Sequence, residues 1–193
     1  PLAAATGIGH TRWATHGAPT DTNAHPHLDP AGRVAVVHNG IIENYRLLRA
    51  ALDGAAFASD TDTEVVAHLV AAELDAPDGP DLLEAVRRVA GRLEGAYALC
   101  VVSADEPDTI VVARRQAPLI VAAVDGVGLC ASDVAALIEH TGTCAALLDG
   151  QLARIRPDGY TVIDADGSAA TAEEYTVDWD LSSAEKQGYD HFM

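Results

Sequence analysis

The chain has 193 residues, of which 49% are hydrophobic and 21% charged, so it suits one globular domain that buries a core without disulfides or metal. Its 29 acidic residues against 12 basic ones give a formal net charge of −17, which argues against nucleic acid and anionic membrane surfaces as partners. No apolar run reaches the length of a membrane span and the start lacks a signal-peptide pattern, so we expect a cytoplasmic protein.

The first predicted strand, Ile8 to Trp13, leads into a loop that extends to about Arg33. The strand overlaps Gly9 to Gly17, a glycine-bounded segment that is rich in histidine, threonine and aromatic side chains. Arg12 lies where strand and loop meet, and a guanidinium there can bind a small anionic ligand by gripping its carboxylate with two parallel hydrogen bonds. The alternative is an amphipathic strand with a solvated arginine and a partly buried tryptophan.

The second predicted strand, Val34 to His38, leads to a helix over about Asn44 to Leu52. Asn39 and Gly40 follow directly after this strand, where a side-chain amide and a backbone N–H can form an oxyanion hole for acyl transfer. Asn-Gly is also a strong hairpin signal. A hairpin is disfavoured here because the following residues lead into a helix and not into a returning strand.

Two further helices are predicted before the chain becomes strand-rich. Thr61 to Glu64 has the spacing of a capping box and opens a helix that continues to Leu74. Asp75 to Pro80 forms a turn, and Asp81 begins a helix through Leu93.

Short apolar segments with the period of strands follow, separated by Asp, Pro or Gly, and they predict an antiparallel meander. A short helix capped by Ser132 and Asp133 comes next, and then a hairpin around Pro157 to Gly159. Strands followed by helices and then many strands indicate the α+β class. The segments are Ala96–Val102, Thr109–Arg114, Leu119–Val124 and Val127–Ala131, and the hairpin strands are Gln151–Arg156 and Tyr160–Asp164.

Motifs spread over the whole chain occur in the order found in one family. They are Gly9–Gly17, Asn23–His27, His38–Asn44, Thr61–Val65, Arg114–Val121, Ala131–Asp133 and the tail Glu185–Met193. The chain resembles the glutaminase domain of glutamine:fructose-6-phosphate amidotransferase, also called glucosamine-6-phosphate synthase.

The resemblance implies a four-layer α/β/β/α sandwich, the fold of the N-terminal nucleophile hydrolases, with two antiparallel sheets between helical layers. We expect residues 1–168 to be the glutaminase domain without its first strands and first helix, which would lie upstream of Pro1. Residues 169–193 would be a tail toward a sugar-isomerising domain that follows Met193.

The resemblance also implies roles for individual residues. Glutamine is hydrolysed in the family through a thioester on an N-terminal cysteine, and this chain has no matching residue because it begins with Pro1. Arg12 matches the ligand of the substrate α-carboxylate and Asp62 the ligand of the α-amine. Asn39 and Gly40 match the oxyanion donors. The loop that closes over glutamine is matched by Trp13, Thr15 and His16.

Five histidines within 29 positions raise the alternative of a metal site. It is disfavoured because no cysteine accompanies them, no HExxH spacing occurs, and the resemblance implies neither metal nor cofactor. The histidines are His10, His16, His25, His27 and His38.

The three cysteines show no Cys-x-x-Cys spacing and each lies in an apolar stretch. We therefore predict that Cys100, Cys130 and Cys144 are small buried hydrophobic side chains in a reducing compartment. A catalytic role for any of them is disfavoured.

The expected partners are glutamine, fructose 6-phosphate at the isomerase domain, and a second copy of the protein through that domain. Two alternatives stay open. One is the glutaminase domain of another amidotransferase, such as one acting on phosphoribosyl pyrophosphate. The other is a non-catalytic domain that binds glutamine or a partner subunit, for which Arg12 and Asp62 would suffice without Asn39.

Overall fold

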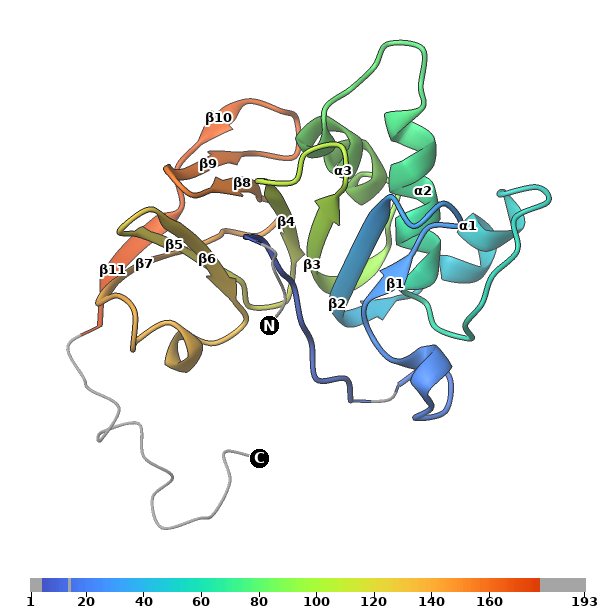
Figure 1. The fold of residues 1–193 in the computed structure, drawn as a ribbon, viewed down its shortest axis with the longest axis horizontal. Helices are drawn as coiled ribbons and strands as arrows, with labels where there is room; N and C mark the ends of the chain where they lie inside the picture. Colours follow the sequence, from blue (N-terminus) through green and yellow to red (C-terminus); the bar gives the residue numbers. More distant parts are fainter. Residues whose placement is uncertain (1–4, 14, 178–193) are drawn as a thin grey trace.

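Two antiparallel sheets form the body of the molecule in the computed structural model, which describes residues 5–13 and 15–177. The first sheet has the strand order β1-β2-β3-β4-β8-β9-β10 and the second β11-β7-β5-β6 (Figure 1). The first sheet comprises β1 (His27–Leu28), β2 (Val34–Ile42), β3 (Gly95–Ser103), β4 (Ile110–Arg115), β8 (Leu152–Arg156), β9 (Gly159–Ile163) and β10 (Ala169–Ala170). The second comprises β5 (Ile120–Val124), β6 (Val127–Ala131), β7 (Thr143–Ala146) and β11 (Glu173–Thr176).

Helices α1 (Tyr45–Ala50), α2 (Glu64–Leu74) and α3 (Leu82–Ala90) gather on one side of the first sheet (Figure 1). Their apolar side chains and those of β2 and β3 make the largest core cluster, which includes Val36, Leu69, Val86 and Leu99. Burying this surface is the main contribution to the stability of the layer. The predicted helix start at Asp81 is confirmed, because the Asp81 side chain caps α3 by accepting the backbone N–H of Glu84.

A second core lies between the two sheets, where Val121 of β5 packs with Val112 and Ile155 of the first sheet. The opposite face of β5 packs against Leu137, just after the 3₁₀ turn η2 (Val134–Ala136). The second sheet is therefore covered on its outer face by the segment around this turn. The predicted α+β fold with two packed antiparallel sheets is confirmed.

The predicted meander is wrong in one respect, because β4 and β5 belong to different sheets. Strand β4 pairs with β3 and β8 of the first sheet, whereas β5 pairs with β6 and β7 of the second. The chain switches sheets between Arg115 and Ile120, so consecutive strands cover both faces of the second core. Sequence periodicity cannot detect such a switch, since each strand looks the same in either sheet.

Four short strands, β1, β7, β10 and β11, were not predicted individually. Residues 169–170 and 173–176 lie in the segment expected to be a tail, and they pair with β9 and β7. The expected tail continues through residues 178–193, which lie outside the described residues. The domain boundary after residue 168 stays a prediction.

Two local expectations are wrong. Ile8 to Trp13 is not a strand, because no described strand pairs with its backbone. The capping box at Thr61 to Glu64 does not form, although the helix does. Glu64 instead accepts hydrogen bonds of 2.7 Å from the backbone N–H groups of Ala58 and Ser59, which hold the loop before α2.

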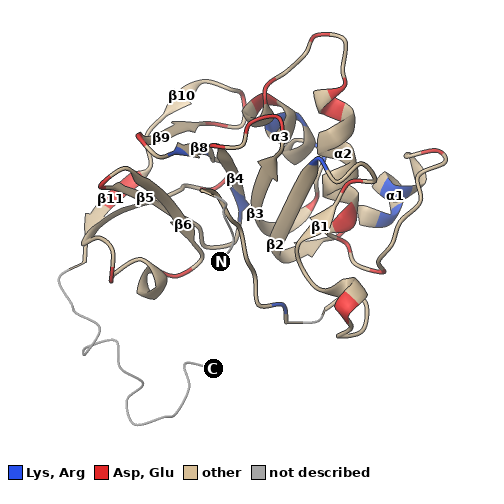
Figure 2. Cartoon of the chain, in the orientation of Figure 1, with Lys and Arg blue, Asp and Glu red and all other residues tan. Residues whose placement is uncertain are grey.

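The excess of acidic residues is spread over loops and helix ends rather than gathered in one patch (Figure 2). Several arginines form ion pairs with carboxylates, namely Arg33, Arg87, Arg88, Arg92, Arg154 and Arg156. Among the described residues, no helix combines the length and apolar character that crossing a membrane requires.

Candidate functional site

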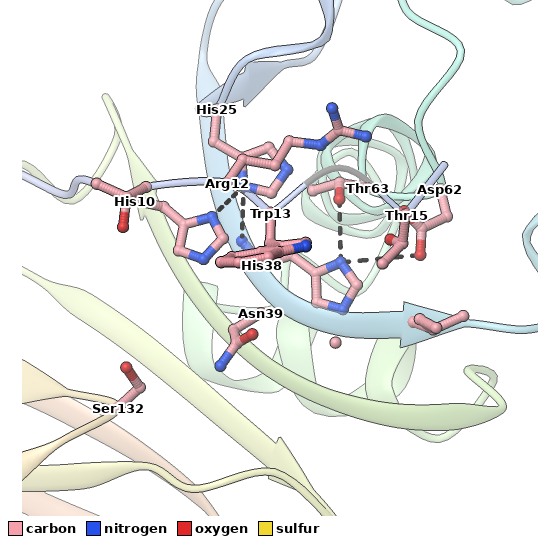
Figure 3. Close-up of a pocket in the computed structure, with 13 residues that line it drawn as sticks. His10, Arg12, Trp13, Thr15, His25, His38, Asn39, Asp62, Thr63 and Ser132 are labelled. Atoms are coloured by element: carbon pink, nitrogen blue, oxygen red, sulfur yellow. Dashed lines mark hydrogen bonds and ion pairs between the residues drawn. The ribbon is translucent and has the colours of Figure 1, made fainter. Parts of the chain in front are cut away.

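A pocket of about 420 Å³ opens where β2, the start of α2 and the segment after residue 9 meet (Figure 3). Segments far apart in the sequence build its walls, including Ser132 at the end of β6 in the other sheet. Residues lining it are His10, Thr11, Arg12, Trp13, Thr15, His25, His38, Asn39, Gly40, Ile41, Asp62, Thr63 and Ser132. Six of the seven residues predicted for the site are therefore in one cavity, and only His16 is not among them.

Arg12 brings a positive charge to this pocket. Its guanidinium donates to the backbone carbonyls of His16 and Gly17, which fixes the turn of the loop around it. Among the described residues, no carboxylate lies within ion-pair distance of Arg12, unlike the six surface arginines. A guanidinium without a carboxylate partner in a pocket suits an anionic ligand.

Asp62 supplies a negative charge to the same pocket. The side chain is 4% exposed and its Oδ2 accepts a 2.8 Å hydrogen bond from the backbone N–H of Ile42. Oδ2 also lies 4.0 Å from Nδ1 of His38, whose ring is within 3.0 Å of the Thr63 hydroxyl. An arginine and an aspartate on one pocket are suited to the carboxylate and ammonium groups of an amino acid.

Asn39 and Gly40 were predicted to follow the second strand. They lie within it instead, because β2 continues to Ile42. Both are exposed to the pocket, and the Asn39 side chain reaches from β2 toward the wall that carries Ser132 (Figure 3). Gly40 has φ +131, and a Cβ there would stand 2.1 Å from the carbonyl oxygen of Ala96 on β3. Only glycine fits this close approach of the two strands.

The loop residues predicted to cover the ligand differ in their surroundings. Trp13 is 78% exposed, so the alternative of a partly buried core tryptophan is wrong. Thr15 is exposed at the pocket. The His16 ring lies outside the cavity and meets the edge of Tyr45, with ring centroids 5.2 Å apart. The His16 ring thus contacts α1 and not the cavity.

Several histidines gather at the pocket, where the rings of His10 and His25 stack and His27 meets His25 edge to face. His10 and His25 approach to 2.7 Å between their Nδ1 atoms, and His27 reaches the Thr61 hydroxyl at 2.9 Å. Burial lowers the pKa of His25 to about 3 and of His38 to about 4, with neighbouring histidines adding to the effect. Within the described residues, no group of three His, Cys, Asp or Glu side chains has the arrangement to hold a metal ion.

The profile of the family described as "Glutamine amidotransferase domain" matches residues 10–139, the part of the chain that contains every residue lining the pocket. The chain belongs to the glutamine amidotransferase family. The expected resemblance to glutaminase domains is thereby confirmed.

Curated relatives of this amidotransferase domain are named glutamine--fructose-6-phosphate aminotransferase [isomerizing]. The protein from Streptomyces coelicolor is 60% identical over 193 residues, 99% of this chain and 31% of the relative. The protein from Thermotoga maritima is 50% identical over 189 residues, 97% of this chain and 30% of the relative. The chain thus spans about a third of the length of these relatives.

Solved structures support the fold of the amidotransferase domain. Glutamine phosphoribosylpyrophosphate amidotransferase from B. subtilis superposes with a TM-score of 0.65 at 22% identity, covering 83% of this chain and 35% of that protein. A structure titled as the allosteric regulatory enzyme of purine biosynthesis gives 0.67 at 23% identity, with the same coverage. The sandwich expected for N-terminal nucleophile hydrolases is consistent with both.

Sequence reasoning did not assign every residue of the pocket. Thr63 and Ser132 were singled out only as helix-start residues and as parts of the ordered motifs, and Ile41 only as part of a helix lead-in. His38 was considered as the end of a strand, as part of an ordered motif and as a metal ligand, but not as a neighbour of Asp62, against which its ring lies. Proximity of these side chains depends on the pairing of distant segments, which a linear pattern does not encode.

Proposed function

We propose that this chain is the glutamine-hydrolysing, ammonia-donating part of an isomerising aminotransferase that forms glucosamine 6-phosphate from fructose 6-phosphate and glutamine. The observation that carries the proposal is the pairing of Arg12 and Asp62 on one pocket whose wall contains Asn39 and Gly40. The names of the relatives support the acceptor sugar.

Each residue has a definite part in this chemistry. Arg12 binds the α-carboxylate of glutamine and Asp62 its α-ammonium group, so the side-chain amide is the part of the substrate that meets Asn39 and Gly40. The Asn39 amide and the Gly40 backbone N–H donate to the oxyanion that forms when a thiolate attacks that amide. Trp13 and Thr15 lie on the segment that would close over the substrate and exclude water.

The thiol that attacks the glutamine amide is not supplied by the residues that line this pocket. None of the three cysteines is among the residues that line the pocket. The proposal therefore requires a cysteine other than these three, and the resemblance implies one at the N-terminus of the mature enzyme with its own amine as base. Sugar isomerisation, dimer formation and the cytoplasmic location likewise belong to the proposed whole enzyme.

The test uses the protein at its natural length and measures glutamate and glucosamine 6-phosphate released from glutamine and fructose 6-phosphate. Arg12→Gln should weaken glutamine binding about 10- to 100-fold, corresponding to the loss of about 1.5 to 3 kcal/mol from a charged hydrogen-bonded contact. Arg92→Gln is the matched control, since Arg92 forms only a surface ion pair of 3.4 Å with Glu73.

Two results would contradict the proposal in different ways. Equal glutamine affinity in the Arg12 and Arg92 variants would show that the pocket is not the binding site for glutamine. If glutamate is released but no amino sugar forms with any hexose phosphate, the protein is a glutaminase and a hexose phosphate is not its acceptor.

A further inference from the structure

Two cysteines that sequence reasoning treated as separate apolar side chains lie next to each other. The Sγ atoms of Cys100 and Cys130 are 3.8 Å apart. Cys100 belongs to β3 of the first sheet and Cys130 to β6 of the second, so the thiols meet across the space between the sheets. A disulfide needs an S–S distance of about 2.05 Å, so the sulfurs would have to approach by about 1.8 Å.

The backbone around Cys130 is held against the first sheet. A Cβ at Gly128 would stand 2.5 Å from the carbonyl oxygen of Arg156 on β8, so β6 and β8 are in close contact two residues before Cys130. This contact keeps the Cys130 side chain directed at β3. The two thiols therefore meet as a result of the packing of the sheets and not of a flexible loop.

Both cysteines border a small cavity through which an oxidant would have to approach. The cavity has a volume of about 150 Å³ and also contacts His10, His38 and Asn39 of the candidate glutamine pocket. Hydrogen bonding between the thiols lowers the pKa of Cys130, which favours its thiolate as the first nucleophile. Cys144 is not among the residues that line this cavity, and it packs on the outer face of the second sheet.

We propose that Cys100 and Cys130 are a modification site at which a hydroperoxide forms a reversible disulfide between the two sheets. The Cys130 thiolate attacks one oxygen of hydrogen peroxide, breaks the O–O bond and becomes a sulfenic acid, and the hydroxide released takes up a proton to give water. The Cys100 thiol then attacks the sulfenic sulfur. An S–S bond forms, the S–O bond breaks, and hydroxide leaves with the Cys100 proton as a second water.

The cross-link would join two walls of the neighbouring pocket. Ser132 follows two residues after Cys130, and Cys100 pairs with Val37, two residues before Asn39. Closing the gap between the sulfurs draws these walls together and adds a covalent tie to β6, an edge strand. Oxidation should therefore slow amide hydrogen exchange at residues 130–132.

The experiment treats the reduced protein at its natural length with graded hydrogen peroxide, blocks remaining thiols and maps peptides without reduction. Cleavage after arginine and glutamate separates the three cysteines, because Glu106 and Arg115 lie between the first two and Glu139 lies before the third. We expect the Cys100 peptide linked to the Cys130 peptide, release of both by dithiothreitol, and a Cys144 peptide that stays a blockable thiol.

Cys144→Ser is the matched control and should give the same link. Cys130→Ser should give no link at Cys100 and no slowing of exchange at residues 130–132 after the same treatment. The proposal is overturned if Cys100 and Cys130 oxidise separately, link to Cys144 instead, or remain thiols when peroxide oxidises other groups of the protein. A disulfide that forms without slower exchange would support the modification site but contradict its effect on the pocket wall.

Discussion

The carboxylate of Asp62 accepts a hydrogen bond of 2.8 Å from the backbone N–H of Ile42. This bond ties the loop before α2 to the last residue of β2, the strand that carries Asn39 and Gly40. Oδ1 of Asp62 accepts no hydrogen bond from the described residues and is left for a ligand on the pocket side. One side chain thus joins two elements and supplies a negative charge to the site.

The variant Asp62→Asn separates these two functions. The asparagine side chain keeps an oxygen that can accept the Ile42 N–H, whereas the charge that attracts the substrate ammonium group is lost. We expect KM for glutamine to rise about 10- to 100-fold, corresponding to about 1.5 to 3 kcal/mol, while the melting temperature changes little. Steady-state glutaminase kinetics and calorimetry on one preparation check this. A large fall in melting temperature at unchanged KM would make Asp62 purely structural.

The sequence predicted the fold class and which residues would gather at one pocket, whereas the roles of those residues stay predictions. Arg12, Asn39, Gly40 and Asp62 were assigned from motifs, and they share one cavity. The strand at Ile8 to Trp13 was wrong because pairing requires a partner strand at the right place, and a periodic pattern cannot report whether one is present. The contact between the two thiols in β3 and β6 was missed for a related reason, since it depends on which face of which sheet each strand presents.

Asn39 provides the sharpest test of the oxyanion hole. Asn39→Ala removes the amide donor from an exposed position, so the free energy of unfolding should stay within about 0.5 kcal/mol of wild type. The glutaminase kcat should fall about 10² to 10³-fold, because the lost hydrogen bond forms with the developing oxyanion. Rate measurements under saturating glutamine check this. A variant with the full rate would exclude the assigned role.

Gly40 should be far more sensitive to alanine than glycines with similar backbone freedom. A Cβ at Gly40 collides with the carbonyl of Ala96, whereas Gly54 has φ +74 and nothing within 4 Å. Gly54→Ala should cost about 1 to 2 kcal/mol from the backbone conformation alone. Gly40→Ala should cost more, because β2 and β3 must also separate. Urea unfolding of both variants measures the difference, and equal losses would contradict the close approach.

Trp13 tests whether the loop closes. Since the indole is 78% exposed, Trp13→Ala should change the free energy of unfolding by less than about 0.5 kcal/mol. A bound glutamine analogue should nevertheless protect the amides of Thr15 to Gly17 from hydrogen exchange in the wild type, and less so in the variant. Exchange followed by mass spectrometry checks this. Unchanged exchange on saturation with the analogue would rule out a closing loop.

His38 should make the fold sensitive to acid. Burial lowers its pKa from 6.5 to about 4, so below pH 6.5 the unfolded chain binds a proton that the folded chain does not. The free energy of unfolding therefore falls as pH decreases from about 7 toward 4, by about 3 kcal/mol for this residue, and His10, His25 and His27 act in the same direction.

The comparison that isolates this effect is the difference in urea-unfolding free energy between about pH 7 and about pH 4.5. This range covers most of the interval between the His38 pKa in the unfolded chain and its pKa in the folded chain. His38→Gln should show a smaller difference than wild type, whatever its stability at neutral pH, because glutamine does not titrate. Replacing the exposed His140 by glutamine should leave the wild-type difference intact. If both variants lose the same amount as wild type on acidification, a buried neutral His38 is not the cause of the acid sensitivity.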